Sequence, residues 1–125
     1  MNVEGYYPLP VSMLETDTEE AIRIGFDIST DLSTYFKFKQ GQYVTLQMDI
    51  DNQPVRRSYS ICSGVDEEIQ VAIKRVEGGL FSNHVHETLS PGDIIWVRPP
   101  EGNFYLETDV TASRRYLFIA AGSGI

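Results

Sequence analysis

Apolar and polar residues alternate along most of this chain, which is the pattern of strands that bury one face. The alternation predicts six strands, near residues 8–15, 20–28, 42–50, 53–60, 68–76 and 93–99. In the fifth of these segments, the two-residue period of a strand places Ile69, Val71 and Ile73 on the inward-facing side. Turn signals separate the segments at regular spacing, so consecutive strands are expected to run antiparallel.

A helical period appears clearly in one place only. Phe81, Val85 and Leu89 recur at i, i+4 and i+8 after a glycine pair, and the turn sequence SPGD over residues 90–93 ends the helix. Six strands with one helix predict a mainly β fold, a closed antiparallel barrel with one capping α-helix, rather than alternating βαβ units.

The last part of the chain has a different pattern. Residues 107–113 are polar like a linker, residues 116–121 form an unbroken apolar run, and residues 122–124 form a glycine turn. A strand followed by Gly-x-Gly begins dinucleotide-binding folds. We therefore expect one domain over residues 1–112, and a linker and the first strand of a truncated nicotinamide-binding domain over residues 113–125. An unpaired apolar strand also favours a dimer through this segment.

Composition narrows the class of protein. The formal net charge of -8 over 125 residues argues against a nucleic-acid or anionic-membrane partner. No apolar run approaches the roughly 20 residues of a membrane span, and the first residues lack a secretion signal, so we expect a cytoplasmic protein. The single cysteine excludes an intrachain disulfide and a cluster held by four cysteines of this chain. His84 and His86 are two apart on a helix, so no metal site is expected.

Candidate chemistry concentrates in RRSYSICSG, residues 56–64. On a strand, Arg57 and Tyr59 share one face while Ser58 and Ser60 share the other. A ligand with a phosphate and a planar ring would meet the charge of Arg57 and the ring of Tyr59, and Ser60 would supply a donor at the ring edge. An ordinary exposed strand face carries the same residue types, so the alternative without a ligand stays open.

A second candidate anion site is VEGGLFSN, residues 76–83, where a glycine pair leads into the helix with Ser82 in its first turn. Helix N-termini present unpaired amides and a partial positive charge, which favour phosphate. Ordinary helix entry is the alternative. The two sites, together with Lys74 at a neighbouring strand end, predict that this protein binds a dinucleotide at two points.

Four elements occur in order along the chain: Arg57-Ser58-Tyr59-Ser60, Ile73-Lys74-Arg75, Gly78-Gly79 with Ser82, and a final apolar strand ending AAGSGI. This series resembles the flavin domain of the ferredoxin-NADP reductase superfamily. The resemblance covers the chain from about Tyr7 onward and is greatest to reductases that serve phenylacetate or other aromatic degradation. It implies a Greek-key barrel that binds FAD.

The resemblance also implies roles for single residues. Arg57 would pair with the flavin pyrophosphate, Tyr59 would pack against the isoalloxazine and ribityl, and Ser60 would donate near the reactive ring nitrogen. Tyr59 and Ser60 are therefore the candidate catalytic residues. The other implied FAD contacts are Tyr43 of the GQY element, Ser58, the backbone along Val71, Ile73 and Lys74, and the helix start at Gly79, Leu80, Phe81 and Ser82.

The implied activity is electron transfer from NAD(P)H through FAD to an iron–sulfur or oxygenase partner. The nicotinamide-binding domain and any iron–sulfur cluster would lie outside this chain, so we expect no complete turnover by it alone. The alternatives are the flavin domain of a flavohaemoglobin or of a dehydrogenase electron-transfer subunit, FMN in place of FAD, and, from another class, a noncatalytic barrel that binds a protein.

Overall fold

The structure is a computed structural model that describes residues 4–107 and 109–121. All six predicted strands and the predicted helix are present, with bounds within a few residues of those expected. In chain order the elements are β1 (Tyr7–Thr16), β2 (Ala21–Phe26), β3 (Tyr43–Ile50), β4 (Gln53–Ser60), β5 (Gln70–Lys74), α1 (Leu80–Thr88) and β6 (Ile94–Glu101).

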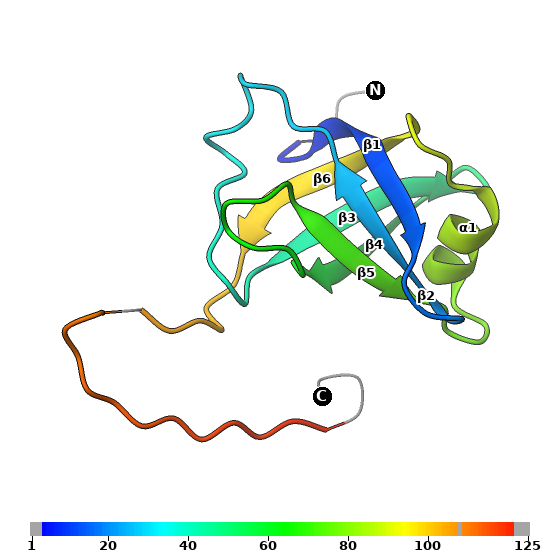
Figure 1. The fold of residues 1–125 in the computed structure, drawn as a ribbon. Coiled ribbons are helices and arrows are strands. Elements are labelled where there is room, and N and C mark those ends of the chain that lie inside the picture. Colours follow the sequence, from blue (N-terminus) through cyan, green and yellow to red (C-terminus); the bar gives the residue numbers. More distant parts are fainter. Residues whose placement is uncertain (1–3, 108, 122–125) are drawn as a thin grey trace.

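The strands form one sheet in the order β4-β3-β6-β1-β2-β5, and every named pair is antiparallel. Figure 1 shows how this sheet curls on itself, with α1 at one end of the strands. The predicted fold class, a mainly β antiparallel Greek-key barrel with one helix, is confirmed.

The expectation that the barrel is closed is wrong, because β4 and β5, at the two ends of the strand order, leave one seam open. The only pairing described across this seam is an isolated bridge between Ile61 and Val71, beside which the Cys62 amide donates to the Gln70 carbonyl at 2.9 Å. Along the rest of their length β4 and β5 have no ladder to each other.

The turn between β3 and β4 fixes the register on which the site depends. Asp51 and Asn52 both have positive φ, 51° and 62°, which short polar side chains tolerate best and which matches a tight hairpin turn. The turn places Ile50 opposite Gln53, and the register then runs without a shift to Tyr43 opposite Ser60.

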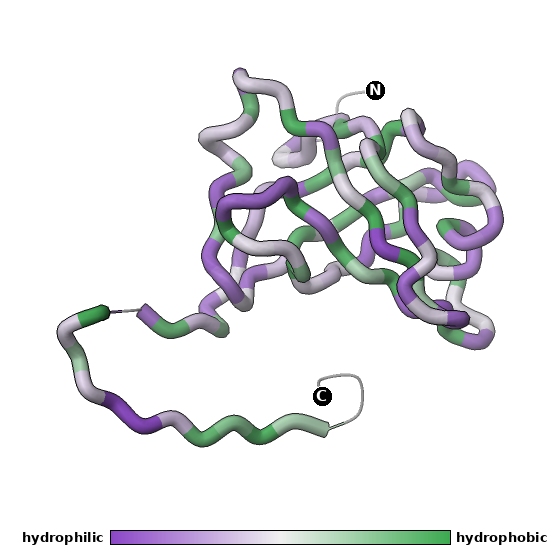
Figure 2. Tube along the Cα trace, in the orientation of Figure 1, coloured by the Kyte–Doolittle hydropathy of each residue, from purple (hydrophilic) through white to green (hydrophobic). Residues whose placement is uncertain are grey.

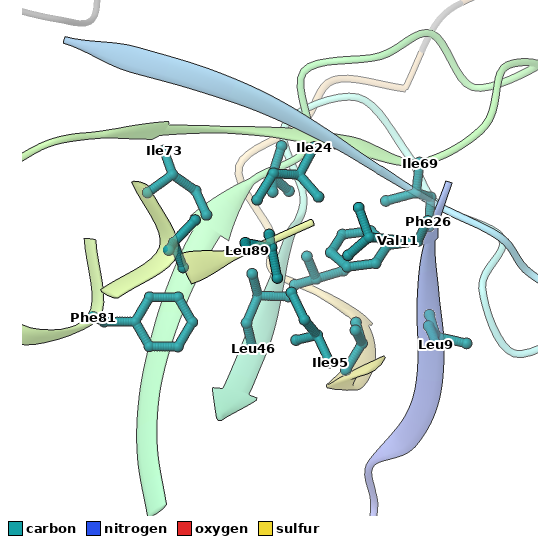
Figure 3. Close-up of a cluster of buried hydrophobic side chains, with 14 of the residues drawn as sticks. Leu9, Val11, Ile24, Phe26, Leu46, Ile69, Ile73, Phe81, Leu89 and Ile95 are labelled. Atoms are coloured by element: carbon teal, nitrogen blue, oxygen red, sulfur yellow. The ribbon is translucent and has the colours of Figure 1, made fainter. Parts of the chain in front are cut away.

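The core fills the barrel with aliphatic and aromatic side chains (Figure 3). Ile69, Val71 and Ile73 point inward as predicted, with exposures of 3%, 0% and 0%. The helix also packs on this core, because Phe81, Val85 and Leu89 are all buried. The inner face of the sheet thus supports the element on which the second predicted site lies.

Residues 109–121 leave the barrel as an extended segment (Figure 1). They form no strand, and the apolar run within residues 116–121 is exposed, as the green end of the tube in Figure 2 shows. The expectation that this run begins a second domain stays a prediction, and the glycine turn of residues 122–124 lies outside the described residues. Within the described ranges, no helix has the length and apolar character that crossing a membrane requires.

Candidate functional site

The register of the β3–β4 hairpin sorts the RRSYSICSG residues onto two faces. Arg57 lies opposite Leu46, and Tyr59 lies opposite Val44. Directly opposed residues of an antiparallel pair point to the same side. Since Val44 and Leu46 are fully buried, Arg57 and Tyr59 belong to the inner face of the sheet, toward the open seam.

The outer face of the same hairpin carries Arg56, Ser58 and Ser60. The hydroxyls of Ser58 and Thr45 share a hydrogen bond of 2.8 Å. The Arg56 guanidinium donates to the Gln47 amide oxygen at 2.6 Å and lies 4.8 Å from the centre of the Tyr6 ring. Arg56 is thus engaged within the fold, on the face opposite to Arg57.

A groove of about 410 Å³ follows the seam on the inner side and brings the two predicted sites together. Its lining residues come from β4, β5 and the start of α1: Arg57, Tyr59, Ala72, Lys74, Val76, Gly79, Leu80, Phe81 and Ser82. The structure therefore unites most of the residues that the sequence pattern singled out, although they are far apart in the chain.

Main-chain groups of β4 are open toward this groove. The Ile61 amide donates to Gln42 before β3, whereas the next amide, of Cys62, donates across the seam to Gln70. Main-chain groups alternate in direction along a strand, so those of Ser58 and Ser60 also point toward the seam. Ser58 and Ser60 can thus offer a ligand their backbone, even though the Ser58 side chain is engaged elsewhere.

Main-chain groups of β5 meet the groove in the same alternating way. The Arg75 amide donates to Glu20, and the Ile69 carbonyl accepts from Phe26, so the odd-numbered residues of β5 bond to the β2 side. By the same alternation, Ala72 and Lys74 turn their amides and carbonyls toward the seam.

The side chains of Val71 and Ile73 do not line the groove, and the expected contact of their backbone with the cofactor stays a prediction. Both side chains are fully buried, and Figure 3 shows Ile73 within the core cluster. The Ile73 carbonyl also lies 2.9 Å from the His86 ring nitrogen. The backbone of this segment reaches the groove at Ala72 and Lys74 instead, and Ala72 has no side-chain chemistry that the sequence pattern could have revealed.

Arg57 gives the groove an available positive charge. It is exposed, one of its guanidinium nitrogens donates to the Arg56 carbonyl at 2.7 Å, and it forms no ion pair within the described ranges. Lys74 makes only a long contact of 3.9 Å with Glu20, with both side chains exposed. Arg75, in contrast, is paired with Glu87 at 2.6 Å. The unpaired charge next to the groove favours an anionic ligand.

Tyr59 lines the groove with an aromatic ring. Its ring centre lies 5.9 Å from that of Phe81, and the residue is half-buried. Burial raises the pKa of the Tyr59 phenol above the usual 10.0, and the nearby Arg57 cation partly offsets this shift. The phenol is therefore neutral at physiological pH.

The start of α1 presents main-chain amides. Gly79 is the N-cap residue with extended φ and ψ of -71° and 119°, and the first helical bond runs from the Asn83 amide to the Gly79 carbonyl. The amides of Leu80, Phe81 and Ser82 precede that bond, so they have no partner inside the helix.

Ser82 and Asn83 hold the preceding loop in place. The Ser82 hydroxyl accepts from the Val76 amide at 3.1 Å, and the Asn83 side-chain amide donates to the carbonyls of Val76 and Gly79 at 3.0 and 2.6 Å. Since Ser82 and Phe81 are buried, the helix start offers a ligand mainly its amides and the Leu80 side chain. Sequence reasoning missed the bracing role of Asn83, because these contacts depend on the conformation of the loop.

Tyr43 does not lie among the groove residues. It is half-buried on the outer face, opposite Ser60 in the ladder, and its ring lies against Gly102. The preceding Gly41 has φ of 97°, and a side chain there would collide with the Phe104 carbonyl. The GQY element therefore packs against the chain that leaves β6, near the end of β4 but apart from Arg57.

Comparison with known proteins identifies the class. The sequence model of the family described as "Oxidoreductase FAD-binding domain" matches residues 9–105. This match covers most of the chain, so the chain belongs to this family of oxidoreductase FAD-binding domains, and its cofactor is FAD. The ferredoxin-reductase-type resemblance drawn from the ordered motifs is thereby confirmed.

Individual relatives cover several oxidoreductases. The chain is 39% identical over 121 residues to a subunit of the 1,2-phenylacetyl-CoA epoxidase of Escherichia coli, covering 96% of this chain and 34% of that protein. It is 41% identical over 102 residues to the glycine betaine monooxygenase reductase subunit of Pseudomonas aeruginosa, with coverage of 80% and 27%. It is 37% identical over 89 residues to a flavohemoprotein of Pseudomonas aeruginosa, with coverage of 70% and 22%.

A solved structure shares the fold. Phthalate dioxygenase reductase, described as a modular structure for electron transfer from pyridine nucleotides to [2Fe-2S], matches with a TM-score of 0.68 at 23% identity, over 83% of this chain and 32% of that one. The chain spans about a third of the length of the curated relatives it matches, or less.

Proposed function

We propose that this chain forms the FAD-binding part of an NAD(P)H-dependent reductase that passes electrons to an iron–sulfur or oxygenase partner in phenylacetate or other aromatic degradation. Its family and its 39% identity with the 1,2-phenylacetyl-CoA epoxidase protein support this proposal. The observation that carries it is the groove at the seam, which joins the unpaired Arg57, the half-buried Tyr59 ring and the start of α1.

The groove residues fit the chemical parts of FAD. The pyrophosphate suits the Arg57 guanidinium and the amides of the α1 start, because both favour anions. The isoalloxazine ring and the ribityl chain of FAD suit the face of the Tyr59 ring. The polar edge of a flavin ring has donors and acceptors, which suit the open main-chain groups of Ser60 and Ala72 along the seam.

Bound FAD would supply the conversion between two-electron and one-electron transfer, and the chain's own residues would seat and orient it. Ser60, the last residue of β4, would hydrogen-bond at the ring edge, where its main-chain groups point toward the seam. Tyr59 would pack against the ring as a neutral phenol, because its pKa lies above the ordinary value of 10.0. The contacts of FAD with Tyr43 and with the backbone of Val71 and Ile73, which the family resemblance implies, stay part of this proposal.

We assign the FAD-binding barrel to residues 1–112 and a linker with the first strand of a nicotinamide-binding domain to residues 113–125. The exposed apolar run within residues 116–121 supports this division, because an unbroken apolar run is typical of a strand that is buried on both faces of a parallel sheet.

A second candidate is the flavin domain of a flavohaemoglobin, which the 37% identity with a flavohemoprotein supports. The two candidates differ in the acceptor and share the FAD site. Transfer of electrons from the intact NAD(P)H-reduced protein to a separate oxygenase favours the first candidate, whereas transfer to a haem domain on the same chain favours the second.

The proposal is tested by titrating the purified chain with FAD and following flavin fluorescence, with Arg57→Ala as the variant. Loss of a charge-assisted hydrogen bond costs about 1.5–3 kcal/mol, so the FAD dissociation constant is expected to rise by roughly 10- to 150-fold. Arg56→Ala is the matched control, since this neighbouring cation faces the other side. Absence of FAD binding by the wild-type chain, or equal effects of both variants, would contradict the proposed site.

A further inference from the structure

A second hollow, of about 430 Å³, lies apart from the cofactor groove and shares none of its described lining residues. Its walls are the loop of residues 27–42 after β2 and the loop of residues 61–69 between β4 and β5, which lie side by side in Figure 1. The buried side chains of Phe26, Phe36 and Ile69 form its floor. Val65 adds an apolar side chain that is 49% exposed. The hollow thus presents apolar surface that packing among the described residues leaves uncovered.

Carboxylates dominate the rim of this hollow. Four of its lining residues carry exposed carboxylates: Asp27, Asp66, Glu67 and Glu68. Among the described residues that line the hollow, Lys37 is the one cation, and it forms no ion pair with these carboxylates. The carboxylates likewise have no ion pair elsewhere within the described ranges. Glu68 accepts a hydrogen bond from the Ser12 hydroxyl, which is uncharged, so the rim keeps its negative charge.

The charge of the rim decides between classes of ligand. Nucleotides and flavins carry phosphates, which the carboxylates repel. Within the described residues, no group of three or more His, Cys, Asp or Glu side chains could hold a metal ion. Lysine and arginine side chains fit instead, because their methylene stems bury on apolar surface while their charged ends reach carboxylates. The net charge of -8 on the whole chain also attracts a cationic partner.

The hollow lies next to one end of the cofactor groove. Ile61 forms the bridge to Val71 that closes the seam at this end, directly after Ser60 ends β4. Asp66 follows Ser60 by six residues, so the two lie at most about 22 Å apart. The proposed site places the flavin ring at this end and the phosphates farther along β4, at Arg57. A protein bound at the hollow is therefore close to the ring.

We propose that this hollow is the docking site for a basic segment of the protein that receives electrons from the flavin; this inference rests on the proposed function. Lysine or arginine side chains of the segment pair with the carboxylates of the rim, and an aliphatic side chain packs on Val65 and the apolar floor. Opposite charges on the two proteins raise the rate at which they meet and favour one orientation.

The first test needs no flavin. A fluorescently labelled peptide of alternating lysine and leucine is titrated with the purified chain, and binding is followed by fluorescence anisotropy. Asp66→Lys is expected to raise the dissociation constant about fivefold to twentyfold, because a repulsion replaces an attraction. Val65→Ser is expected to raise it roughly twofold to fivefold through lost apolar contact.

Asp49→Lys is the matched control. Asp49 is an exposed aspartate of β3 that lines neither the hollow nor the groove, and its substitution changes the net charge by the same amount. It is expected to leave the dissociation constant within about twofold of the wild type, because its charge is remote from the hollow and largely screened by salt. A peptide with glutamate in place of lysine is expected not to bind.

Two outcomes of this titration overturn the docking site. Equal effects of Asp66→Lys and Asp49→Lys would reduce the binding to net charge. Tighter binding of the lysine peptide to a chain ended at Ala112 would show that the chain's own extended segment covers the hollow.

A second measurement connects the hollow with electron transfer. The FAD-loaded chain is reduced with dithionite, and each reduced flavin then passes one electron to each of two molecules of ferric cytochrome c, a basic haem protein. Asp66→Lys is expected to slow this reaction about fivefold or more and not to slow the reduction of ferricyanide, a small anion. Equal slowing with both acceptors overturns the docking role. A chain that binds the lysine peptide but no FAD overturns the proposed function, whereas a chain that binds FAD but not the lysine peptide overturns the docking site alone.

Discussion

At the scale of single residues, two adjacent arginines have separate roles because strand geometry turns them to opposite faces. Arg56 is bonded to Gln47 and stacked over Tyr6, so its charge belongs to the outer sheet surface. Arg57 faces the seam and lacks a carboxylate partner within the described ranges. A surface that carries a net charge of -8 thereby keeps a local site for an anion.

Tyr59 gives a prediction on pH. Burial raises the pKa of its phenol, so folding favours the neutral form. The stability that depends on this neutral form is fully present below the ordinary pKa of 10.0 and is lost as pH rises through the raised pKa. The difference in unfolding free energy between the wild type and Tyr59→Phe is therefore expected to change only as pH rises above 10.0, where the wild type loses stability relative to the variant. Chemical denaturation of both proteins below and above pH 10.0 measures it, and a difference that is the same on both sides of pH 10.0 would contradict a raised pKa.

At the scale of elements, the loop before α1 is shaped by close contacts that only glycine permits. A Cβ atom at Gly79 would lie 2.7 Å from the Ser82 hydroxyl oxygen and 3.0 Å from the Val76 carbonyl oxygen. These are the same groups that brace the loop, so a side chain here would disturb both the brace and the amides that face the groove.

Gly79→Ala is expected to destabilise the chain by roughly 1–3 kcal/mol and to weaken FAD binding as well, because overpacking shifts the helix start. Thermal unfolding and FAD titration measure the two effects. Gly64→Ala serves as the control, since its Cβ would meet only the flexible end of Glu67. An alanine at Gly79 that leaves FAD binding intact would show that the helix start does not contact the cofactor.

The alternation of apolar residues was enough to predict the strands and the helix, because one buried face imposes a period of two and one helical stripe a period near four. It also placed Arg57 and Tyr59 on one face. The alternation did not reveal that the main-chain groups of Val71 and Ile73 hydrogen-bond toward β2. Nor did it reveal that those of Ala72 and Lys74 point to the groove. Both facts depend on which neighbour each strand pairs with. The brace by Asn83 depends on a loop conformation that no periodicity encodes.

At the scale of the whole molecule, the binding groove exists because the barrel does not close. The strands β4 and β5 are the two ends of the sheet, and the described residues join them only near Ile61 and Val71. Unpaired strand edges usually attract another strand. Here the helix start and the groove occupy the seam, which leaves main-chain groups available to a small ligand.

The extended segment gives a prediction on domain organisation. Residues 113–121 are exposed, so ending the chain at Ala112 is expected to leave the thermal unfolding midpoint unchanged. Size-exclusion chromatography of the full and shortened chains tests the alternative that the apolar run pairs two copies. A lower midpoint for the shortened chain would contradict the division of the chain after residue 112.

We expect FAD to lie in the groove along the seam between β4 and β5. Amide chemical shifts of the labelled chain, recorded by NMR with and without FAD, test it most directly. We predict that the largest changes fall on the amides of Ser58, Ser60, Ala72 and Lys74 and on the first turn of α1, while the amide of Thr45 on the outer face stays unchanged. Changes confined to the outer face, or to the separate hollow beside Phe36, would contradict the claim.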